Sequence, residues 1–359
     1  MLRLEPRREP SAVMRALSPA LAVLLTLIAG FIAFTLMGYN GALAIEQIAL
    51  APLLDPVRWP DLLIKAAPLI LIATGLSIGF RANVWNIGAE GQYILGAIFA
   101  TGAALATWEM SGRWILPLML VAGAAGGAAW AAIPAFLRVR WKVSEILVSL
   151  MLTYVSIQLL YYLVRGPWKD PQGFNFPQTR MFSDSQTLPA IIEGSLVHLG
   201  VPIAIAVAII AWILMSRSLF GYSVRLVGMA PQAARHAGFS ENRTIWATLL
   251  ISGALAGFAG ALEAAGPFGQ LVPQFPANYG FTAIIVAFLG RLDPLGVIAG
   301  ALLLAVTYVG GELAQTSAGL PQAAAGVFQA MLLFFLLAVD VLARYRIRVG
   351  GPAHARAGA

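Results

Sequence analysis

The stretch Gly79–Gln92 reads GFRANVWNIGAEGQ, and it sets an arginine, two asparagines, a tryptophan, a glutamate and a glutamine between two strongly apolar segments. Polar groups beside or inside a lipid bilayer are costly unless they are paired or line a water-filled space. Such a break in a hydrophobic segment is typical of a transport pathway. An ordinary polar turn between two helices has the same pattern, and the stretch alone does not separate these two interpretations.

The composition is that of an integral membrane protein. The chain has 359 residues, of which 59% are hydrophobic and only 11% are charged, more apolar surface than a water-soluble protein of this size could bury. The absence of cysteine excludes disulfides, thiolate catalysis and cysteine-ligated metal sites. The net charge of +7 does not indicate nucleic acid binding, because the arginines fall in short clusters between apolar spans, as topology signals do.

The apolar segments predict an all-α, polytopic membrane protein with about ten transmembrane helices, most of them near the ~20 residues that a crossing needs. The segments lie near 19–38, 62–80, 91–108, 114–136, 146–165, 196–216, 244–263, 279–290, 294–312 and 322–342. The third and the eighth are the weakest, and the eighth has only twelve positions. Whether 91–108 and 279–290 cross fully or re-enter stays open.

The first segment has a second interpretation as a signal peptide, because basic residues precede it and Ala42-Leu43-Ala44 imitates a cleavage site. Its apolar run of about 19 residues is longer than the ~7–15 of a signal peptide core, so we expect a retained helix.

The distribution of basic residues supports ten crossings with both termini in the cytoplasm. This topology places 17 of the 23 basic residues inside, and Lys65 within a span. The remaining five lie outside, at Arg58, Arg113, Arg165, Lys169 and Arg180. Cytoplasmic loops carry an excess of lysine and arginine in membrane proteins. An eight-crossing alternative without the third and eighth segments would invert the middle of the chain and spoil this bias.

The expected organisation is a single transmembrane domain at 19–343 between cytoplasmic tails at 1–18 and 344–359. The largest outside loop, 166–195, is proline-rich, which disfavours a long helix. The largest inside loop is 217–243. Five segments on each side of the 166–195 loop permit two five-helix inverted repeats, an arrangement that many transporters use. Glycine pairs such as Gly123/Gly127 and Gly253/Gly257 have the spacing of close helix crossings.

The chain carries no recognisable enzymatic motif. Its three histidines, His198, His236 and His354, are far apart in sequence, and it has neither an HExxH metal pair nor a GxSxG elbow. A phosphate-binding P-loop is excluded because none of the three lysines follows a glycine. We therefore assign no catalytic residue and no metal site, and we expect His198, near a helix start, to be structural.

The inside loop contains GYSVRLVGMAPQAARHAGFSENR at Gly221–Arg243. Pro231 can begin a short helix there, and Gly238 can end it. Such a helix would present small side chains at Ala233, Ala234 and Ala237, which would let another protein come close. A basic loop that only marks the topology is the alternative.

Acidic residues at two expected inside turns have simpler roles. Glu145 begins the fifth segment and would meet the positive end of that helix favourably. Asp293 could cap the following helix or pair with Arg291. Glu90 is the best single candidate for an ion-coupling carboxylate, but it lies in the polar break rather than in the middle of a helix.

Four passages together resemble the permease subunits of bacterial ABC importers of the branched-chain amino acid, ribose and nucleoside type. NVWNIGAEGQ at 83–92 resembles the NIGxEGQ motif of the nucleoside and simple-sugar branch, and KVSEILVSLMLTY at 142–154 resembles its NEVISTIMLNY segment with Ser144 in place of asparagine. GFTAIIVAFLGRLDPLG at 280–296 resembles GFxxIAVALLGxxxPLG. GMAPQAARHAG at 228–238 is similar to the coupling segment GxNPxAARYAG, with Ala230 in place of asparagine. The four occur in order between about residues 60 and 345.

The resemblance implies a subunit of the bacterial cytoplasmic (inner) membrane that translocates a small polar solute, a nucleoside or a simple sugar, by alternating access. It implies cytoplasmic ABC ATPase partners that bind ATP and Mg, a second permease subunit in a heterodimer, and an extracytoplasmic solute-binding protein or lipoprotein. Residues implied to line or gate the pathway are Asn83, Trp85, Asn86, Glu90 and Gln92. Residues implied to contact the ATPase are Gly228, Pro231, Ala233, Ala234, Arg235 and Gly238.

Two other classes compete with this interpretation. A secondary transporter driven by an ion gradient uses similar broken helices, but it would be expected to carry paired buried carboxylates, and the sequence offers no clear pair. A membrane scaffold or assembly factor has no evident use for the polar break. The sequence alone does not establish the substrate, and the direction of transport is inherited from the resemblance.

Overall fold

The computed structural model describes residues 2–6, 12–191 and 195–349, and it divides them between two compact units. Unit 1 comprises Met1–Leu54 with Thr307–Ala359, and unit 2 comprises Asp55–Val306. Residues 1, 7–11 and 350–359 of the predicted tails and residues 192–194 of the predicted outside loop lie outside the described residues.

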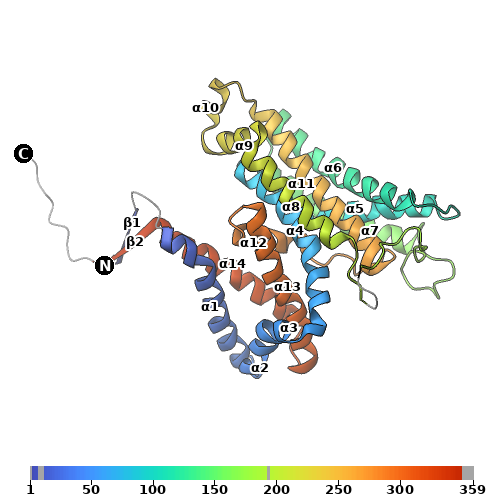
Figure 1. The fold of residues 1–359 in the computed structure, drawn as a ribbon, viewed down its shortest axis with the longest axis horizontal. Coiled ribbons are helices and arrows are strands. Elements are labelled where there is room, and N and C mark those ends of the chain that lie inside the picture. The colour runs from blue at the N-terminus through green and yellow to red at the C-terminus, as the bar shows by residue number, and fades with distance from the viewer. Residues whose placement is uncertain (1, 7–11, 192–194, 350–359) are drawn as a thin grey trace, which may run out of the picture. The chain divides into compact units, whose positions relative to one another are not determined.

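Unit 1 is built around two long helices that pack on each other, α1 and α14 (Figure 1). Its elements are β1 (Leu2–Pro6), α1 (Ala12–Leu36), α2 (Gly41–Ile45), the π-helix η1 (Glu46–Leu50), α3 (Ala51–Leu54), the part of α13 (Pro294–Ser317) from Thr307 onward, α14 (Ala323–Arg344) and β2 (Tyr345–Val349). The two strands pair antiparallel, from Leu2 opposite Val349 to Pro6 opposite Tyr345. Phe34, Ile48 and Phe328 lie in its apolar core.

Unit 2 holds the polar break and most of the predicted spans. Its elements are the 3-10 helix η2 (Pro56–Arg58), α4 (Trp59–Arg81), α5 (Ala89–Ala106), α6 (Ile115–Trp141), α7 (Glu145–Arg165), α8 (Gly200–Arg217), α9 (Leu219–Met229), α10 (Pro231–His236), α11 (Glu241–Glu263), the π-helix η3 (Ala264–Phe268), α12 (Tyr279–Leu289) and the first part of α13. The longest of these helices, α4, α6 and α11 among them, run beside one another in Figure 1.

The predicted all-helical membrane fold is confirmed, because each of the ten predicted segments contains a helix. Eight helices in the described part of the chain are long and apolar enough to cross a membrane. The other two predicted segments are α5, whose first turn carries Glu90 and Gln92, and α12. The 11 residues of α12 rise by only about 16 Å, roughly half of a ~30 Å hydrocarbon core. The number of crossings therefore stays a prediction.

The segment Gly41–Leu54 differs from the sequence analysis, which predicts no helix between the first two spans. It forms the consecutive short helices α2, η1 and α3. This run of alanine, leucine and isoleucine is too short to qualify as a crossing, and its helix is supported by packing within unit 1. Gly310 of α13 lies so close to η1 that a Cβ atom there would come within 2.2 Å of the Ile48 carbonyl oxygen.

Three helices of unit 2 cross through glycines, as the glycine spacings predict. A Cβ atom on Gly96 of α5 would lie 2.1 Å from the carbonyl oxygen of Gly257 in α11. A Cβ atom on Gly257 would lie 2.3 Å from the carbonyl oxygen of Gly123 in α6, and one on Gly127 would lie 2.2 Å from that of Gly253. The backbones of α5, α6 and α11 therefore touch with no side chain between them, which is how membrane helices associate closely.

The loop between α7 and α8 lacks helix in its described part, as its prolines predict. Its backbone is bonded to the chain that follows α11. The N–H groups of Thr179, Phe182 and Leu188 donate to the carbonyl oxygens of Leu271, Gly269 and Ala265 at 2.8–3.0 Å. This loop and the connection between α11 and α12 therefore form one hydrogen-bonded layer at the end of unit 2 that we expect to face outside.

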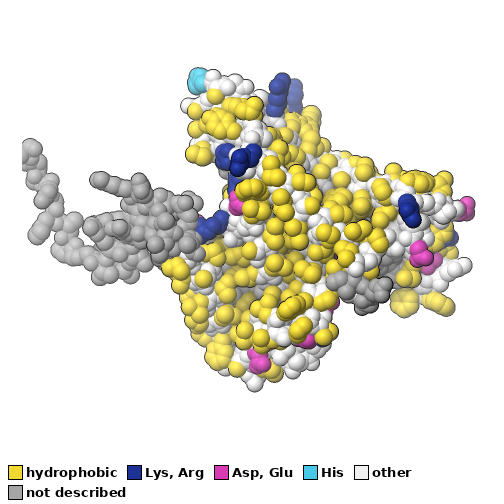
Figure 2. Space-filling model, in the orientation of Figure 1, with side chains coloured by type: hydrophobic (Ala, Val, Ile, Leu, Met, Phe, Trp, Pro, Cys, Tyr) yellow, Lys and Arg dark blue, Asp and Glu magenta, His cyan; other side chains and the backbone are white. Residues whose placement is uncertain are grey.

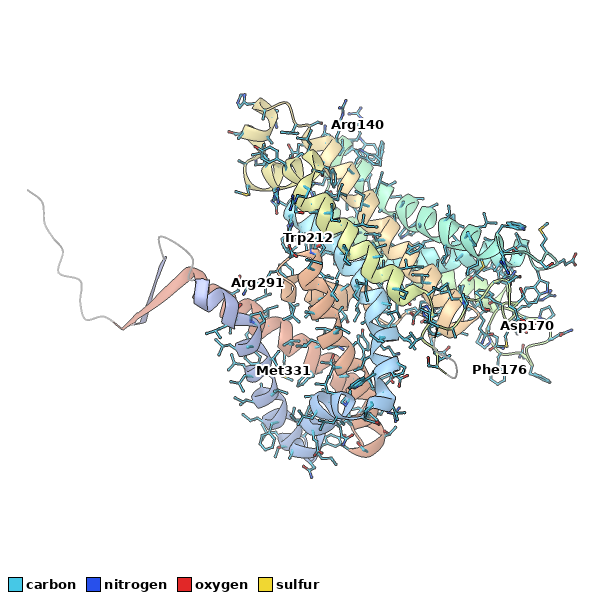
Figure 3. All side chains as sticks on the ribbon, viewed as in Figure 1. Arg140, Asp170, Phe176, Trp212, Arg291 and Met331 are labelled. Carbon is cyan, nitrogen blue, oxygen red and sulfur yellow. The ribbon has the colours of Figure 1, made fainter. Side chains whose placement is uncertain are left out.

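Charged side chains gather at the ends of unit 2, and hydrophobic ones cover its flanks on the face that Figure 2 shows. In that view basic side chains lie near α9 and α10. Figure 3 places Arg140 at this end and Asp170 and Phe176 at the opposite end. The basic end is the one that the charge distribution predicts to face the cytoplasm.

We expect Gly257→Ala to destabilise the protein by about 2 kcal/mol, because the added methyl group must displace the backbone of α6. The matched control is Gly326→Ala in α14, where a Cβ atom would meet nothing within 4 Å. That substitution should be neutral or stabilising by up to ~1 kcal/mol through helix propensity. Thermal unfolding of the two purified variants in detergent measures the difference, and equal midpoints would contradict the close crossing.

His198 lies just before α8 and is buried, with 4% of its surface exposed. Its Nδ1 accepts a hydrogen bond from the Gly200 N–H at 3.0 Å, and its Nε2 packs near Gly266 without a hydrogen-bond partner among the described residues. Burial lowers the pKa of this imidazole below its usual 6.5. Burial in the folded protein thus favours the neutral imidazole over the protonated one.

Because the unfolded chain binds a proton at His198 that the folded chain rejects, stability should fall as the pH drops below about 6.5. We expect His198→Gln, which keeps an acceptor for Gly200, to reduce the difference between the melting temperatures at about pH 7.5 and pH 5. The exposed His236 provides the control variant His236→Gln. Equal pH dependence in both variants would exclude His198 as the source.

Candidate functional site: the polar break between α4 and α5

The polar break begins where α4 ends in a left-handed cap. The Val84 N–H bonds to the Gly79 carbonyl oxygen and the Asn83 N–H to that of Phe80, while Asn83 has a φ of 57°. This is the Schellman arrangement, and asparagine is the residue other than glycine that most readily adopts it. The end of α4 therefore follows from the sequence, and it turns the chain into the connection that leads to α5.

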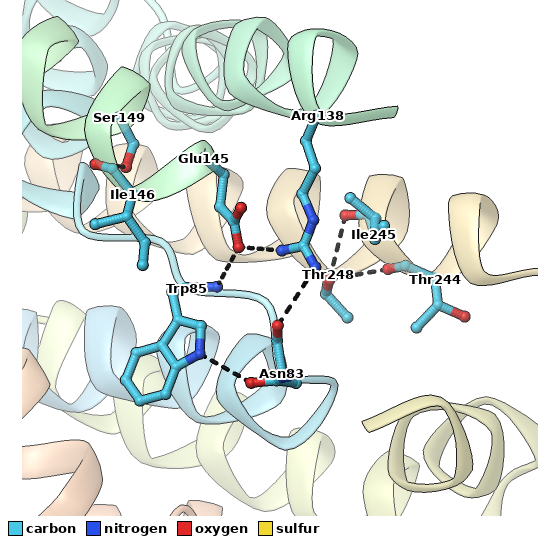
Figure 4. Close-up of polar contacts among 9 residues, drawn as sticks. All are labelled: Asn83, Trp85, Arg138, Glu145, Ile146, Ser149, Thr244, Ile245 and Thr248. Atoms are coloured by element: carbon cyan, nitrogen blue, oxygen red, sulfur yellow. Dashed lines mark hydrogen bonds and ion pairs between the residues drawn. The ribbon is translucent and has the colours of Figure 1, made fainter. Parts of the chain in front are cut away.

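An ion pair from neighbouring helices holds this turn (Figure 4). Arg138 near the end of α6 pairs with Glu145, the first residue of α7. Glu145 also accepts the backbone N–H of Trp85 at 3.1 Å, and Arg138 donates to the Asn83 carbonyl oxygen at 3.4 Å. Glu145 lies at the positive end of its helix as predicted, and in addition it binds the break to α7 and α6.

Asn86 and Gln92 form a reciprocal pair of amides. Asn86 Nδ2 donates to Gln92 Oε1 at 2.7 Å, and Gln92 Nε2 donates to Asn86 Oδ1 at 3.0 Å. Asn86 also donates to the Ser252 hydroxyl of α11 and accepts from the Gly88 N–H. Both amides are 1% exposed. Their hydrogen-bonding groups are thus engaged inside the protein, as burial requires.

Glu90 is a buried carboxylate at the meeting point of two helix N-termini. It belongs to the first turn of α5, and its two oxygens accept the N–H groups of Asn278 and Gly280 at the start of α12, at 2.9 and 2.6 Å. Helix N-termini carry partial positive charge and unpaired N–H donors, so a carboxylate there is stabilised twice. Gly280 is required for the contact, because a Cβ atom would lie 2.1 Å from the Glu90 nitrogen.

Three aromatic rings pack together at the other end of α12. The ring centroids of Phe80 and Trp85 lie 4.9 Å apart, and both rings stack on Phe288, at 5.5 and 6.0 Å. Trp85 Nε1 donates to Asn83 Oδ1 at 3.0 Å. The short helix α12 is therefore held at its N-terminus by Glu90 and at its C-terminus by these aromatic side chains.

The five predicted pathway residues, which we call the polar cluster, form three separate hydrogen-bonded groups: Asn83 with Trp85, Asn86 with Gln92, and Glu90 with the start of α12. Asn86, Glu90 and Gln92 are buried and hydrogen-bonded, whereas Asn83 is exposed and Trp85 is half-buried. Sequence reasoning missed the partners, namely Arg138, Ser252, Asn278, Gly280 and Phe288. The motif at 280–296 marked the region of α12 but did not indicate which residue of the break it contacts. A pathway role for the five residues stays a prediction.

The second predicted site forms the short helix that the sequence indicates. Pro231 begins α10, and Gly238 follows its end with a φ of 83°. Pro231, Ala233 and Arg235 are exposed, but Ala234 is buried, so the small-residue face is narrower than predicted. Gly228 lies on α9 rather than α10 and packs against α4.

Comparison with known proteins agrees with this architecture. The family described as "Branched-chain amino acid transport system / permease component" matches residues 60–337. This chain belongs to that family. The resemblance to ABC importer permeases that four motifs indicate is thereby confirmed, and the protein is a multi-pass membrane permease of this class.

Three relatives match this permease over almost its full length. The glucose ABC transporter permease protein of Haloferax volcanii is 36% identical and covers 97% of this chain and 94% of its own length. The guanosine ABC transporter permease protein of Bacillus subtilis is 30% identical and covers 89% of this chain and 92% of its own length. The nucleoside ABC transporter permease protein of Lactococcus lactis is 27% identical over 90% of each. Each organism has a second relative of this chain named for the same substrate.

We expect Glu90→Gln to lower the stability of the permease by about 2 kcal/mol, the scale of a buried hydrogen bond to a charged group. The amide can accept one of the two α12 N–H groups, but its NH₂ would face the other. The matched control is Glu109→Gln at an exposed position. Thermal unfolding in detergent is the measurement, and an unchanged midpoint for Glu90→Gln would show that the carboxylate does not hold α12.

Proposed function

We propose that this permease is the translocation subunit of an ATP-driven importer for a neutral polar solute, a nucleoside or a simple sugar. The observation that carries the proposal is full-length similarity to permeases named for glucose, guanosine and nucleosides. The polar cluster is chemically suited to such solutes. Trp85 offers an indole surface for stacking, and Asn83 offers an amide for hydrogen bonds to neutral hydroxyl or base groups.

In this proposal the chain itself binds no cofactor and hydrolyses no ATP. A partner ATPase binds ATP and Mg, and its closure moves the permease between outward-open and inward-open states. The exposed helix α10 is the proposed ATPase contact, because its proline start and small Ala233 side chain leave room for a partner's groove. An extracytoplasmic binding protein or lipoprotein would deliver the solute to the opposite end, in the bacterial cytoplasmic membrane.

A different chain is proposed as the second permease. The relatives in Haloferax volcanii, Bacillus subtilis and Lactococcus lactis each come with a second permease named for the same substrate. A homodimer would need only one such chain.

The test is uptake by proteoliposomes that contain the permease, its second permease and its ATPase, supplied with loaded binding protein. We expect vanadate-sensitive uptake that needs internal ATP and survives dissipation of the ion gradients. Labelled guanosine, glucose and leucine in parallel identify the substrate class.

Uptake by the permease alone that collapses with the ion gradient would replace the ABC mechanism by a secondary transporter. Uptake of leucine in preference to guanosine and glucose would keep the mechanism and overturn the substrate class. Omission of the second permease tests the heterodimer, since uptake should then be lost.

A further inference from the structure

Under the proposed function, on which the following proposal rests, a movement of α9 and α10 must reach the polar cluster. The two helices form one block. α10 begins two residues after α9 ends, Ala234 is buried against this block, and the rings of Tyr222 and Phe239 pack 5.7 Å apart. A partner that pushes α10 therefore also moves α9.

α9 touches the end of α4 backbone to backbone. A Cβ atom on Gly228 would lie 2.0 Å from the Arg81 carbonyl oxygen and 3.1 Å from the Ala82 carbonyl carbon. No flexible side chain lies between the two helices at this point that could absorb a shift. Close-packed contacts of this kind transmit displacement rather than damp it. A movement of α9 must therefore displace Arg81.

The side chain of Arg81 continues the connection to the far side of α12. Its Nη2 lies 3.1 Å from Asp293 Oδ2, and the two side chains are 20% and 40% exposed. The other carboxylate oxygen of Asp293 accepts the Leu295 N–H at 3.1 Å and so caps α13. The cap was one predicted role of Asp293, whereas the pairing with Arg81 of α4 was not predicted.

The turn between α12 and α13 is strained where this ion pair reaches it. Arg291 and Leu292 are consecutive non-glycine residues with φ angles of 56° and 58°. Left-handed conformations of bulky residues persist only when their surroundings hold them, and they concentrate at sites of conformational change. Beside the turn, Phe288 stacks on Phe80, the neighbour of Arg81. The last turn of α4 therefore contacts the C-terminal end of α12 through the Phe80–Phe288 stack and the turn after it through the Arg81–Asp293 ion pair.

We propose that Arg81 is a positioning residue that passes the movement of α9 and α10 to α12 through its ion pair with Asp293. A shift of Gly228 displaces the Arg81 backbone that it contacts. The Arg81 guanidinium then pulls on Asp293 in the turn at the start of α13. The half-length helix α12 then shifts against the polar cluster and changes access to it.

The experiment compares Arg81→Gln and Asp293→Asn, singly and together, in the assembled transporter in proteoliposomes. Asp293→Asn keeps an oxygen that can cap α13, so it removes the ion pair alone. We expect each single variant to lower uptake per ATP hydrolysed about tenfold, within the range of coupling between sites. The double variant should lower uptake per ATP hydrolysed no further than either single variant, because both substitutions remove the same ion pair. Arg81→Lys, which keeps the charge, should recover most of the coupling.

The matched control is Arg58→Gln, which removes the exposed ion pair between Arg58 and Asp61 and should leave the ratio unchanged. Normal uptake per ATP in both single variants, or additive losses in the double variant, overturns the proposal. Should Arg81→Gln fail to assemble, Asp293→Asn decides by itself. Absence of ATP-driven uptake in the unsubstituted complex would instead refute the proposed function, so the two failures are distinguishable.

A distance measurement adds a readout that a merely stabilising ion pair would not change. The chain has no cysteine, so spin labels can be placed at Leu219→Cys on α9 and Leu295→Cys on α13, both exposed. With Arg81 present, the distance between the labels should stay constant when ADP and vanadate trap the ATPase. In Arg81→Gln the labels should separate on trapping. A constant distance in both proteins would exclude Arg81 as the link.

Discussion

The geometry of unit 2 depends on the hydrogen bonds that the Glu90 carboxylate accepts from the start of α12. An 11-residue helix is too short to cross a bilayer alone, and the backbone before it lacks helical hydrogen bonds. Without acceptors, the N–H groups of Asn278 and Gly280 at its start would lose their hydrogen bonds, at a cost of about 1–3 kcal/mol for the buried Gly280 N–H. Glu90 supplies both acceptors at once. The charge is stabilised in turn because it sits at two helix N-termini, so the buried acid and the short helix require each other.

Glu90 can reach the start of α12 only because the surrounding helices pack very closely. α5 must reach the start of α12, and Gly280 permits the contact, while Gly96 and Gly257 bring α5 and α11 together. The same approach places Ser252 of α11 within 2.9 Å of Asn86. In lipid there is no hydrophobic driving force between helices, so close backbone packing and interhelical hydrogen bonds must hold them together. Both are concentrated where the polar break enters the bundle.

Much of the fold could be predicted from the sequence, because its signals are local. The start of α10 at Pro231, the left-handed Gly238 after it and the glycine crossings all follow from properties of single residues or fixed spacings. The partners of the polar break could not be predicted. Nothing near Glu90 in the sequence points to residues 278 and 280, and Gly228 resembles a part of the coupling segment although it packs on α4. The helices at Gly41–Leu54 were missed because they are too short to carry a membrane signal.

The polar cluster also limits which of its members can meet a solute. Asn86 and Gln92 already bond each other, with Asn86 also bonded to Ser252 of α11, and Glu90 bonds the start of α12. A solute that bound them would have to replace hydrogen bonds that connect α5, α11 and α12. Each bond lost in a buried site costs more than a new one returns, since the unpaired partner keeps its desolvation penalty. Asn83 is exposed and Trp85 is half-buried, and the side-chain hydrogen bond between them is exposed, so replacing it costs less. A division of labour follows from this chemistry: Glu90 joins α5 to α12, and in the proposed movement of α12 the more exposed Asn83 and Trp85 are the residues that change neighbours. Packed interfaces of this kind switch between discrete arrangements rather than deform continuously, which is the property that alternating access requires.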